Sequence, residues 1–316
     1  MSSRAGLCPR WLVSALISTA LGTLLGLGCT GEASAAPPRA ARDVRFATVD
    51  GTPLLLDVYP AENSAKPVGL IVWVHGGAWR AGSRASPGLL GLTSRGWALA
   101  SVDYRLSTAA RFPAQVFDIK AALRYLRAHA GEYGVAGVPF VIAGSSAGGH
   151  LAALAGVSNG VRELEGTVGD DLSASSDVQA IVSLYGASNL TTILEQSSPH
   201  GLSVRVPALE LLLGGQPVAQ PALARLASPV FHVDGRDPPL LLLHGGQDDQ
   251  MPAQQSRELE LAYQKLGLPV QLEIVPGAGH GDPVFGDAVH LERIDQFLRA
   301  RLLGSMSVRK LKAARQ

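Results

Sequence analysis

The sequence predicts an α/β protein: a mostly parallel, doubly wound sheet with helices on both of its faces. Three observations lead to this prediction. Short apolar runs recur along the chain, amphipathic stretches lie between them, and glycine-rich clusters follow most of the runs. In a doubly wound sheet the carboxyl ends of the strands meet at one edge, where ligands bind. We therefore expect the glycine-rich clusters to gather at that edge and to form the functional site.

The folded part of the chain begins with a predicted antiparallel hairpin. Residues 44–48 and 54–59 flank Asp50-Gly51, and Asp-Gly is a strong turn signal between two strands. The apolar runs that follow are short and nearly continuous, as expected of strands that are buried on both faces. These runs lie at residues 70–74, 98–102, 140–143, 180–185, 240–243 and 270–275.

Helices are predicted where apolar residues repeat every three or four positions. Residues 115–129 show this repeat clearly, with charged residues on the opposite side. Further helices are predicted at residues 147–157, 256–266 and 291–302.

Two segments between these elements lack a clear pattern. Residues 160–176 are polar and are predicted to form a surface loop. Residues 189–237 have no clean periodicity and contain several prolines. A segment of this length between core strands usually has a functional role, so we expect a lid-like insertion or a wall of the substrate site. The pattern leaves its secondary structure open.

Length and composition fit one domain. The chain has 316 residues, of which 47% are hydrophobic and 17% are charged. We expect a single domain over residues 36–303, followed by a basic C-terminal tail at residues 304–316. The formal net charge of +1 gives no electrostatic argument for a nucleic-acid partner.

The first residues have the pattern of a secretory signal peptide. Basic residues precede an apolar run at residues 11–27, and small residues follow it. Ala33-Ser34-Ala35 predicts a signal over residues 1–35 and a mature chain that begins at Ala36. The alternative is a lipoprotein signal, because Leu27-Gly28-Cys29 resembles the end of a lipobox and would make Cys29 a lipid-modified first residue. Both interpretations predict an exported protein, either secreted or periplasmic, and only the second adds a lipid anchor.

The sequence implies no cofactor. Of the two cysteines, Cys8 lies inside the predicted signal, so the mature chain can form no intrachain disulfide and no cysteine-based metal site. The sequence contains no phosphate-binding Gly-x-x-x-x-Gly-Lys-Ser/Thr loop, and its histidines lack zinc-type spacing.

The most informative short motif is Gly144-x-Ser146-x-Gly148. It lies between a predicted strand and a predicted helix, which is the context of a nucleophile elbow. A serine hydroxyl is a weak nucleophile, so it needs an adjacent base and a backbone that exposes it. A flexible glycine loop is the simpler interpretation of these residues, and the rest of the chain must decide between the two.

The chain after this motif contains a candidate aspartate and a candidate histidine, and their order along the sequence is informative. Ser146, Asp248 and His280 follow the order serine, aspartate, histidine that is typical of α/β-hydrolases. Four motifs then resemble the hormone-sensitive-lipase-type branch of that fold, and in particular its small bacterial feruloyl and acetyl-xylan esterase-like members. The motifs are His75-Gly76-Gly77-Ala78-Trp79, Gly144-Ser145-Ser146-Ala147-Gly148-Gly149-His150, His244-Gly245-x-x-Asp248 and Gly277-Ala278-Gly279-His280. The resemblance extends over about residues 44–303.

The resemblance implies a role for each of these residues. Ser146 would be the nucleophile, His280 the general base and acid, and Asp248 the residue that holds the imidazole. Asp249 is a rival for the last role, although the family spacing selects Asp248. His200, His232 and His290 are weaker candidates for the base.

The same resemblance implies an oxyanion hole that consists of the backbone N–H groups of Gly77, Ala78 and Ala147. His75 is interpreted as a structural hydrogen-bonding residue, whereas Trp79 could either line the substrate site or pack in the core. The sequence Asp103-Tyr104-Arg105 and Asp118 are interpreted as structural contacts that shape this loop.

The predicted function is therefore a serine carboxylic-ester hydrolase that works through an acyl-enzyme. Its expected substrates are short-chain acyl esters, including acetyl or feruloyl esters of polysaccharide. An aryl formamidase, an S9-like peptidase and a non-catalytic ligand-binding member of the fold remain as alternatives. The sequence does not indicate an oligomeric state.

Overall fold

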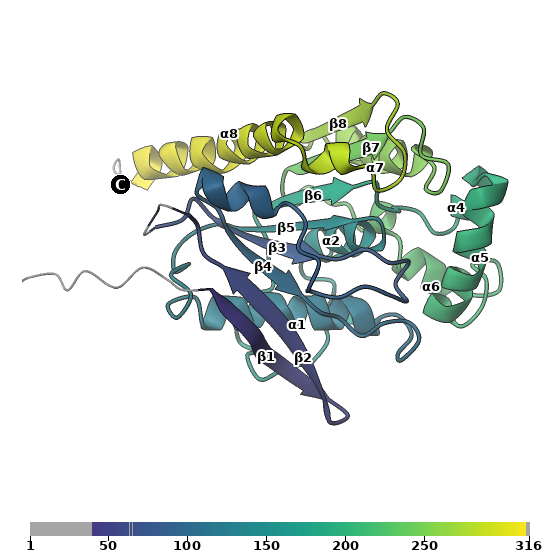
Figure 1. Cartoon of the computed structure of the whole chain (residues 1–316), viewed down its shortest axis with the longest axis horizontal. Coiled ribbons are helices and arrows are strands. Elements are labelled where there is room, and N and C mark those ends of the chain that lie inside the picture. The colour runs from purple at the N-terminus through teal and green to yellow at the C-terminus, as the bar shows by residue number, and fades with distance from the viewer. Residues whose placement is uncertain (1–39, 63, 65, 314–316) are drawn as a thin grey trace, which may run out of the picture. The chain divides into compact units, whose positions relative to one another are not determined.

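A computed structural model describes residues 40–62, 64 and 66–313, with side chains up to residue 303. Eight strands form one sheet in the order β1-β2-β4-β3-β5-β6-β7-β8 (Figure 1). The strands are β1 (Ala41–Val49), β2 (Thr52–Tyr59), β3 (Leu70–Val74), β4 (Ala98–Val102), β5 (Phe140–Ser145), β6 (Ala180–Leu184), β7 (Leu240–Gly245) and β8 (Val270–Val275).

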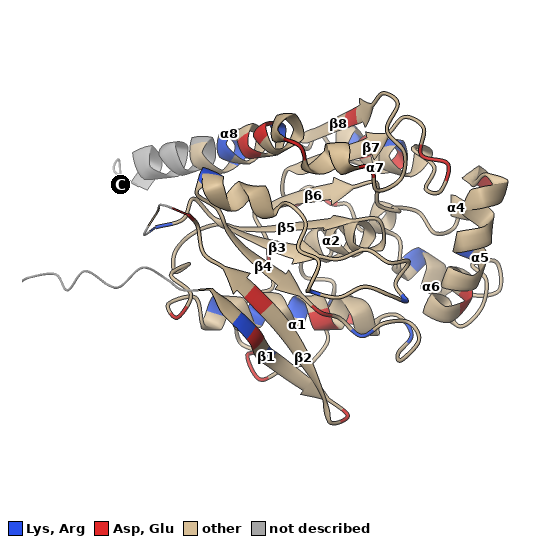
Figure 2. Cartoon of the chain, viewed as in Figure 1, with Lys and Arg blue, Asp and Glu red and all other residues tan. Residues whose placement is uncertain are grey.

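The predicted fold class is confirmed. Strand β2 pairs antiparallel with β1 and with β4, and all the other pairs are parallel. Every residue of β3, β4 and β6 is buried, and the central strands carry no charged side chains (Figure 2). Burial on both faces explains why these strands appear in the sequence as continuous apolar runs.

Helices cover both faces of the sheet. The longer ones are α1 (Ala114–Ala128), α2 (Ala147–Val157), α7 (Gln254–Lys265) and α8 (Ala288–Ala313), and the short 3-10 helices are η1 (Leu90–Arg95), η2 (Pro229–Phe231) and η3 (Pro283–Gly286). Alternate residues of β3 point to opposite faces: Val72 packs in the cluster that contains α1 and α2, and Ile71 packs in the cluster that contains α8.

The segment at residues 189–237 is helical. It contains α4 (Ile193–Gln196), α5 (Pro199–Leu213), α6 (Pro221–Leu226) and η2. Figure 1 shows α4, α5 and α6 beyond the end of the sheet toward which β5 and β6 point. The buried face of α5 includes Gly201 and Arg205 beside its leucines, and Pro207 lies within the helix. A glycine and a charged residue on the buried face break the apolar periodicity, so the pattern did not reveal this helix.

Two other boundaries differ from the predictions. Within the predicted loop at residues 160–176 lies a short helix, α3 (Arg162–Glu165). The last helix, α8, continues to Ala313, which is well into the segment that we expected to be a separate basic tail at residues 304–316.

The predicted signal at residues 1–35, with its cleavage site before Ala36 and the alternative lipid site at Cys29, lies outside the described residues. Among the helices that the structure does describe, none combines the length and the apolar character needed to cross a membrane.

Candidate active site

Ser146 lies at the tight turn between β5 and α2. Its backbone has φ 55° and ψ −120°, which is unusual for a residue with a side chain. The turn is possible because two glycines flank it: a Cβ atom on Gly144 would lie 2.3 Å from the carbonyl oxygen of Gly148, and one on Gly148 would lie 2.1 Å from that of Val74. The sequence Gly-x-Ser-x-Gly therefore satisfies a steric requirement, and the serine projects from the end of the strand.

Strand register brings the other loops of the site to Ser146. Val74 pairs with Gly144, so the segment that follows β3 runs beside the serine turn. Ser145 pairs with Leu184 at the end of β6, and Gly245 pairs with Val275 at the ends of β7 and β8. The carboxyl ends of five strands thus deliver their loops to one edge, as expected for a parallel sheet.

Three side chains from these loops form a hydrogen-bonded chain. His280 Nε2 lies 2.9 Å from Ser146 Oγ, and His280 Nδ1 lies 2.7 Å from Asp248 Oδ2. Because the carboxylate only accepts, Nδ1 carries the imidazole proton and Nε2 is left to accept from the serine hydroxyl. The side chain of Asp248 has no exposed surface, and that of His280 is 13% exposed.

Asp248 is held from several sides. Its Oδ1 accepts from the amides of Gln250 (3.0 Å) and Met251 (2.7 Å), and its Oδ2 lies 3.4 Å from His244 Nε2. Burial disfavours its ionised form, but the hydrogen bonds from His244 and His280 outweigh burial and hold the pKa of Asp248 below its usual range. The carboxylate is therefore ionised at neutral pH.

The rival residues lie elsewhere. Asp249 is exposed and makes none of these side-chain contacts. His290 pairs with Asp287, His232 contacts the carbonyl oxygen of Leu226, and His200 lies on the exposed side of α5. The structure thus brings Asp248 and His280 to Ser146, and it brings neither Asp249 nor the other three histidines.

The loop after β3, residues 75–79, is called the glycine loop below. Gly77, Ala78 and Trp79 all have positive φ values of 108°, 51° and 60°. Successive backbone N–H groups in a turn can form an anion-binding concavity. In the described part of the chain, the amides of Gly77, Ala78 and Ala147 donate to no other group.

Buried contacts hold the glycine loop in place. The Tyr104 hydroxyl donates to the carbonyl oxygen of His75 across 3.1 Å, and the two rings stack with their centroids 4.4 Å apart. Burial lowers the pKa of His75, whose Nδ1 contacts the carbonyl oxygen of Gly76. Nearby, Arg84 pairs with Asp103. These contacts agree with the interpretation of His75 and of the 103–105 segment as structural.

Two further predictions are resolved by contacts. Arg105 binds Asp118 through two nitrogen atoms, with Nη2 2.8 Å and Nε 2.9 Å from its oxygens, so Asp118 is structural. Trp79 is fully buried and donates to His150 Nδ1 across 3.0 Å. It therefore packs in the core and does not line the substrate site.

The serine opens into a cavity of about 410 Å³. Gly77 and Ala78 line it together with Ser146 and His280, and so do Tyr185, Gln250 and Arg80. The Tyr185 ring stands edge-on to the His280 ring, with centroids 4.9 Å apart. No sequence motif pointed to Tyr185, Gln250 or Arg80. Only Tyr185 had a usable signal, because it is the last residue of a predicted strand.

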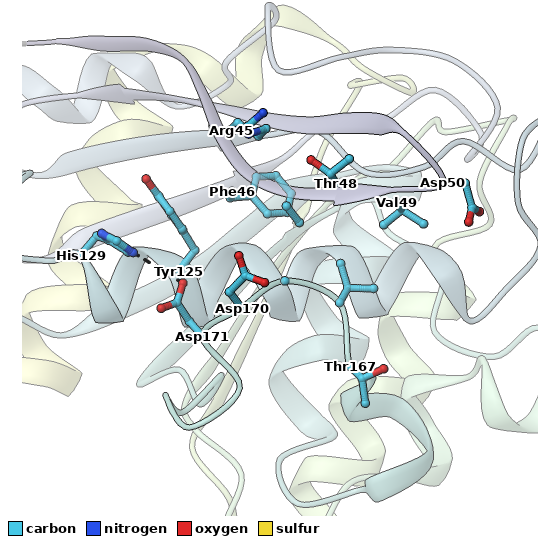
Figure 3. A pocket seen from close by; sticks show the side chains of 13 residues that line it. Arg45, Phe46, Thr48, Val49, Asp50, Tyr125, His129, Thr167, Asp170 and Asp171 are labelled. Carbon is cyan, nitrogen blue, oxygen red and sulfur yellow. Dashed lines mark ion pairs between the residues drawn. The ribbon is translucent and has the colours of Figure 1, made fainter.

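A larger pocket of about 840 Å³ shares no lining residue with this cavity. Figure 3 shows it between β1, the end of α1 and the loop at residues 167–171, with Tyr125 and His129 at one side. Within the described residues, no group of three or more His, Cys, Asp or Glu side chains is arranged to hold a metal ion.

Comparisons with known proteins agree with this architecture. The BD-FAE family model matches residues 56–263. Esterase LipC of Mycobacterium tuberculosis is 32% identical over 236 residues, which cover 72% of this chain and 56% of LipC. A truncated carbohydrate esterase from gut microbiota superposes with a TM-score of 0.76 at 30% identity, covering 84% of this chain and 96% of that one.

A thermophilic esterase from the planctomycete Thermogutta terrifontis superposes with a TM-score of 0.66 at 28% identity, over 83% of this chain and 91% of its own. The chain spans about half the length of the curated relatives that it matches, such as 56% of LipC and 49% of the probable carboxylic ester hydrolase LipM from the same organism. Since the family model covers most of the folded domain and the topology agrees, this chain belongs to the BD-FAE family and has the α/β-hydrolase fold.

Proposed function

We propose that the protein is a serine carboxylic-ester hydrolase that works through an acyl-enzyme intermediate. The observation that carries the proposal is the hydrogen-bonded chain from Ser146 through His280 to Asp248, with contacts of 2.9 and 2.7 Å. These are distances at which a base can take the hydroxyl proton while its second nitrogen stays bound. The esterases among its relatives support the same reaction class.

The mechanism follows from the proton positions. Ser146 Oγ bonds to the acyl carbon while its proton moves to His280 Nε2, and ionised Asp248 stabilises the resulting imidazolium. The carbonyl electrons move to its oxygen, where the amides of Gly77, Ala78 and Ala147 would bind the oxyanion. His280 then gives the proton to the departing alcohol oxygen. A water molecule releases the acyl group by the same steps in reverse.

The proposed substrates are short-chain acyl esters, including acetyl or feruloyl esters of polysaccharide. The cavity of about 410 Å³ beside Ser146 is within the size range of small-molecule sites. A relative that is itself named a carbohydrate esterase supports a carbohydrate ester. Export is part of the proposal, because the first residues have the composition of a signal peptide, with either secretion or a lipid anchor at Cys29 as its outcome. The intact mass of the mature protein distinguishes these two outcomes.

A fluorophosphonate probe tests the proposal directly. We expect one covalent adduct on Ser146, together with loss of 4-nitrophenyl acetate hydrolysis. The variant Ser146→Ala should take up no probe, whereas Ser145→Ala, which changes the adjacent serine, should still be labelled on Ser146. A folded wild-type protein that neither reacts nor hydrolyses the ester would contradict the proposal and favour a ligand-binding role.

A further inference from the structure

Helix α5 packs one face onto the loop that carries Asp248. The Ser198 hydroxyl, at the start of the helix, donates to the carbonyl oxygen of Asp249 across 2.5 Å. One turn later Gly201 approaches closely, since a Cβ atom there would lie 2.9 Å from the carbonyl oxygen of Gln250. A further turn on, Arg205 Nη2 donates to that same oxygen across 3.3 Å. The inserted helix therefore places a guanidinium directly behind Gln250, which lines the cavity.

Arg205 is a buried charge without a matching counter-ion. Its exposed fraction is 0%, and its Nε and Nη1 atoms have no hydrogen-bond partner among the described residues. The carboxylate that acts on it electrostatically, Asp248, is already bound by His280 and by two backbone amides. An arginine this deeply buried is normally paired, because an unpaired buried charge is costly.

A second guanidinium lies on the cavity itself. Arg80 directly follows the glycine loop, is half-buried and lines the cavity, and no ion pair or side-chain hydrogen bond involves it in the described structure. Apart from His280, it is the only ionisable basic residue of the lining, and no carboxylate lines the cavity. Burial lowers the pKa of Arg205 to about 10. Repulsion from Arg80 also lowers this pKa, whereas attraction to Asp248 raises it. Arg205 is therefore charged at neutral pH.

We propose that the site selects esters that carry a carboxylate, in either the acyl or the alcohol part, which binds beside Arg80. Arg205 acts as a positioning residue, because its charge reinforces the positive potential through Gln250. Arg80 is half-buried and Arg205 is fully buried, so their attraction for an anion at the cavity is screened less than it would be in bulk water. This inference rests on the proposed esterase function and adds a substrate class to it.

Matched pairs of esters test the inference. For the alcohol side, 4-acetoxybenzoate is compared with 4-acetoxybenzamide; for the acyl side, monomethyl adipate is compared with methyl adipamate. Each pair shares its ester group and differs mainly in charge. We measure the ratio of kcat/KM for the anion to that for the amide in the wild type, Arg80→Gln, Arg205→Met and Arg162→Gln. Arg162 is exposed at the start of α3 and serves as a control for net charge.

We expect Arg80→Gln to lower this ratio about tenfold in at least one pair, because the neutral amide does not use the charge that the variant removes. Arg205→Met should lower the ratio less, by about threefold, without a loss of thermal stability, because an apolar replacement removes an unpaired buried charge. Arg162→Gln should leave the ratio unchanged. The pair that responds identifies the side of the ester that carries the anion.

If Arg80→Gln leaves the anion-to-amide ratio of kcat/KM unchanged in both pairs, the inference is wrong. Hydrolysis of the neutral amides would still support the esterase function in that case. If no ester is hydrolysed at all, the esterase function fails instead. The anion preference is then decided by binding of 4-acetoxybenzoate and 4-acetoxybenzamide to the wild type and to Arg80→Gln in titration calorimetry. Equal affinities for the two compounds in the wild type would contradict the inference.

Discussion

The indole Nε1 of Trp79 donates a hydrogen bond to His150 Nδ1 across 3.0 Å, and both side chains are completely buried. On its other side, His150 Nε2 lies 2.6 Å from the carbonyl oxygen of Ala227, at the end of α6. Because Nδ1 accepts, Nε2 must carry the proton. One neutral imidazole thus connects the glycine loop, the helix that follows Ser146 and the helical segment at residues 189–237.

This contact makes a prediction about stability in acid. Burial lowers the pKa of His150 to about 4, which is below its usual value in the unfolded chain. As pH falls from about 6.5 toward 4, the unfolded chain takes up a proton that the folded protein does not. We therefore expect His150 to cost the folded state about 2 kcal/mol between pH 7 and pH 5. Urea unfolding at both pH values measures this quantity.

The variant His150→Gln provides the comparison, since its amide can still accept from Trp79 and donate to Ala227 but does not titrate. Relative to the variant, the free energy of unfolding of the wild type should fall by about 2 kcal/mol from pH 7 to pH 5. Parallel pH dependences for the two proteins would show that His150 is protonated in the folded state or that the Trp79 contact does not form.

Asp237 gives the opposite pH dependence. Burial raises the pKa of its carboxyl group to about 7, although a hydrogen bond from the Asp234 amide opposes this rise. The folded protein therefore retains a proton that the unfolded chain releases above about pH 4, and stability falls as pH rises from there to 7. We expect Asp237→Asn to raise the free energy of unfolding at pH 8 by about 1–3 kcal/mol and to change it little at pH 4. Asp50→Asn, in the exposed hairpin turn, is the control, and an equal gain there would argue against a buried carboxyl group.

Asp248 and Asp249 can be separated by matched substitutions. Asp248→Asn keeps the shape of the side chain but removes the negative charge that binds His280 Nδ1. We expect kcat for ester hydrolysis to fall by about 10³–10⁴-fold, because the imidazole then loses its tautomer and its stabilised cation. Asp249→Asn should leave kcat almost unchanged, since Asp249 is exposed and makes no contact with His280. The reverse order of the two effects would assign the acid to Asp249.

The parts of this structure that could be predicted are those with a local signal. Strands such as β3 are buried on both faces, so they appear as apolar runs, and the steric demands around Ser146 require glycines at fixed positions. Helix α5 had no such signal, because Gly201 and Arg205 occupy positions on its buried face. These two residues are explained by contacts with a loop that lies far away in sequence.

The same reasoning applies to the residues around the site. Arg80, Gln250 and Tyr185 converge on one cavity from three different loops, and no short motif records that convergence. The Trp79–His150 contact joins residues from two separate motifs. Sequence patterns can therefore predict Ser146, Asp248 and His280, which the structure joins by hydrogen bonds. The residues that line the cavity around them can be identified only from the tertiary structure.

Gly148 offers a test in which helix propensity and packing predict opposite results. It lies in the first turn of α2, where alanine would ordinarily favour the helix by about 1 kcal/mol. A Cβ atom at this position would, however, lie 2.1 Å from the carbonyl oxygen of Val74 and 2.4 Å from that of His75. Both are backbone atoms of the central strand and the glycine loop, so they cannot move aside cheaply. We therefore expect Gly148→Ala to destabilise the fold by about 2–4 kcal/mol.

The matched control is Gly131→Ala, where the added Cβ atom would meet nothing within 4 Å. Its free energy of unfolding should change by less than about 0.5 kcal/mol. A Gly148→Ala protein that folds should also lose ester hydrolysis, because the displaced glycine loop shifts the amides of Gly77 and Ala78 relative to Ser146. Thermal unfolding of both variants distinguishes helix propensity from packing. A stabilised Gly148→Ala protein would mean that helix propensity outweighs the close approach, and that the carbonyl oxygens of Val74 and His75 lie farther from Gly148 than 2.1 and 2.4 Å allow.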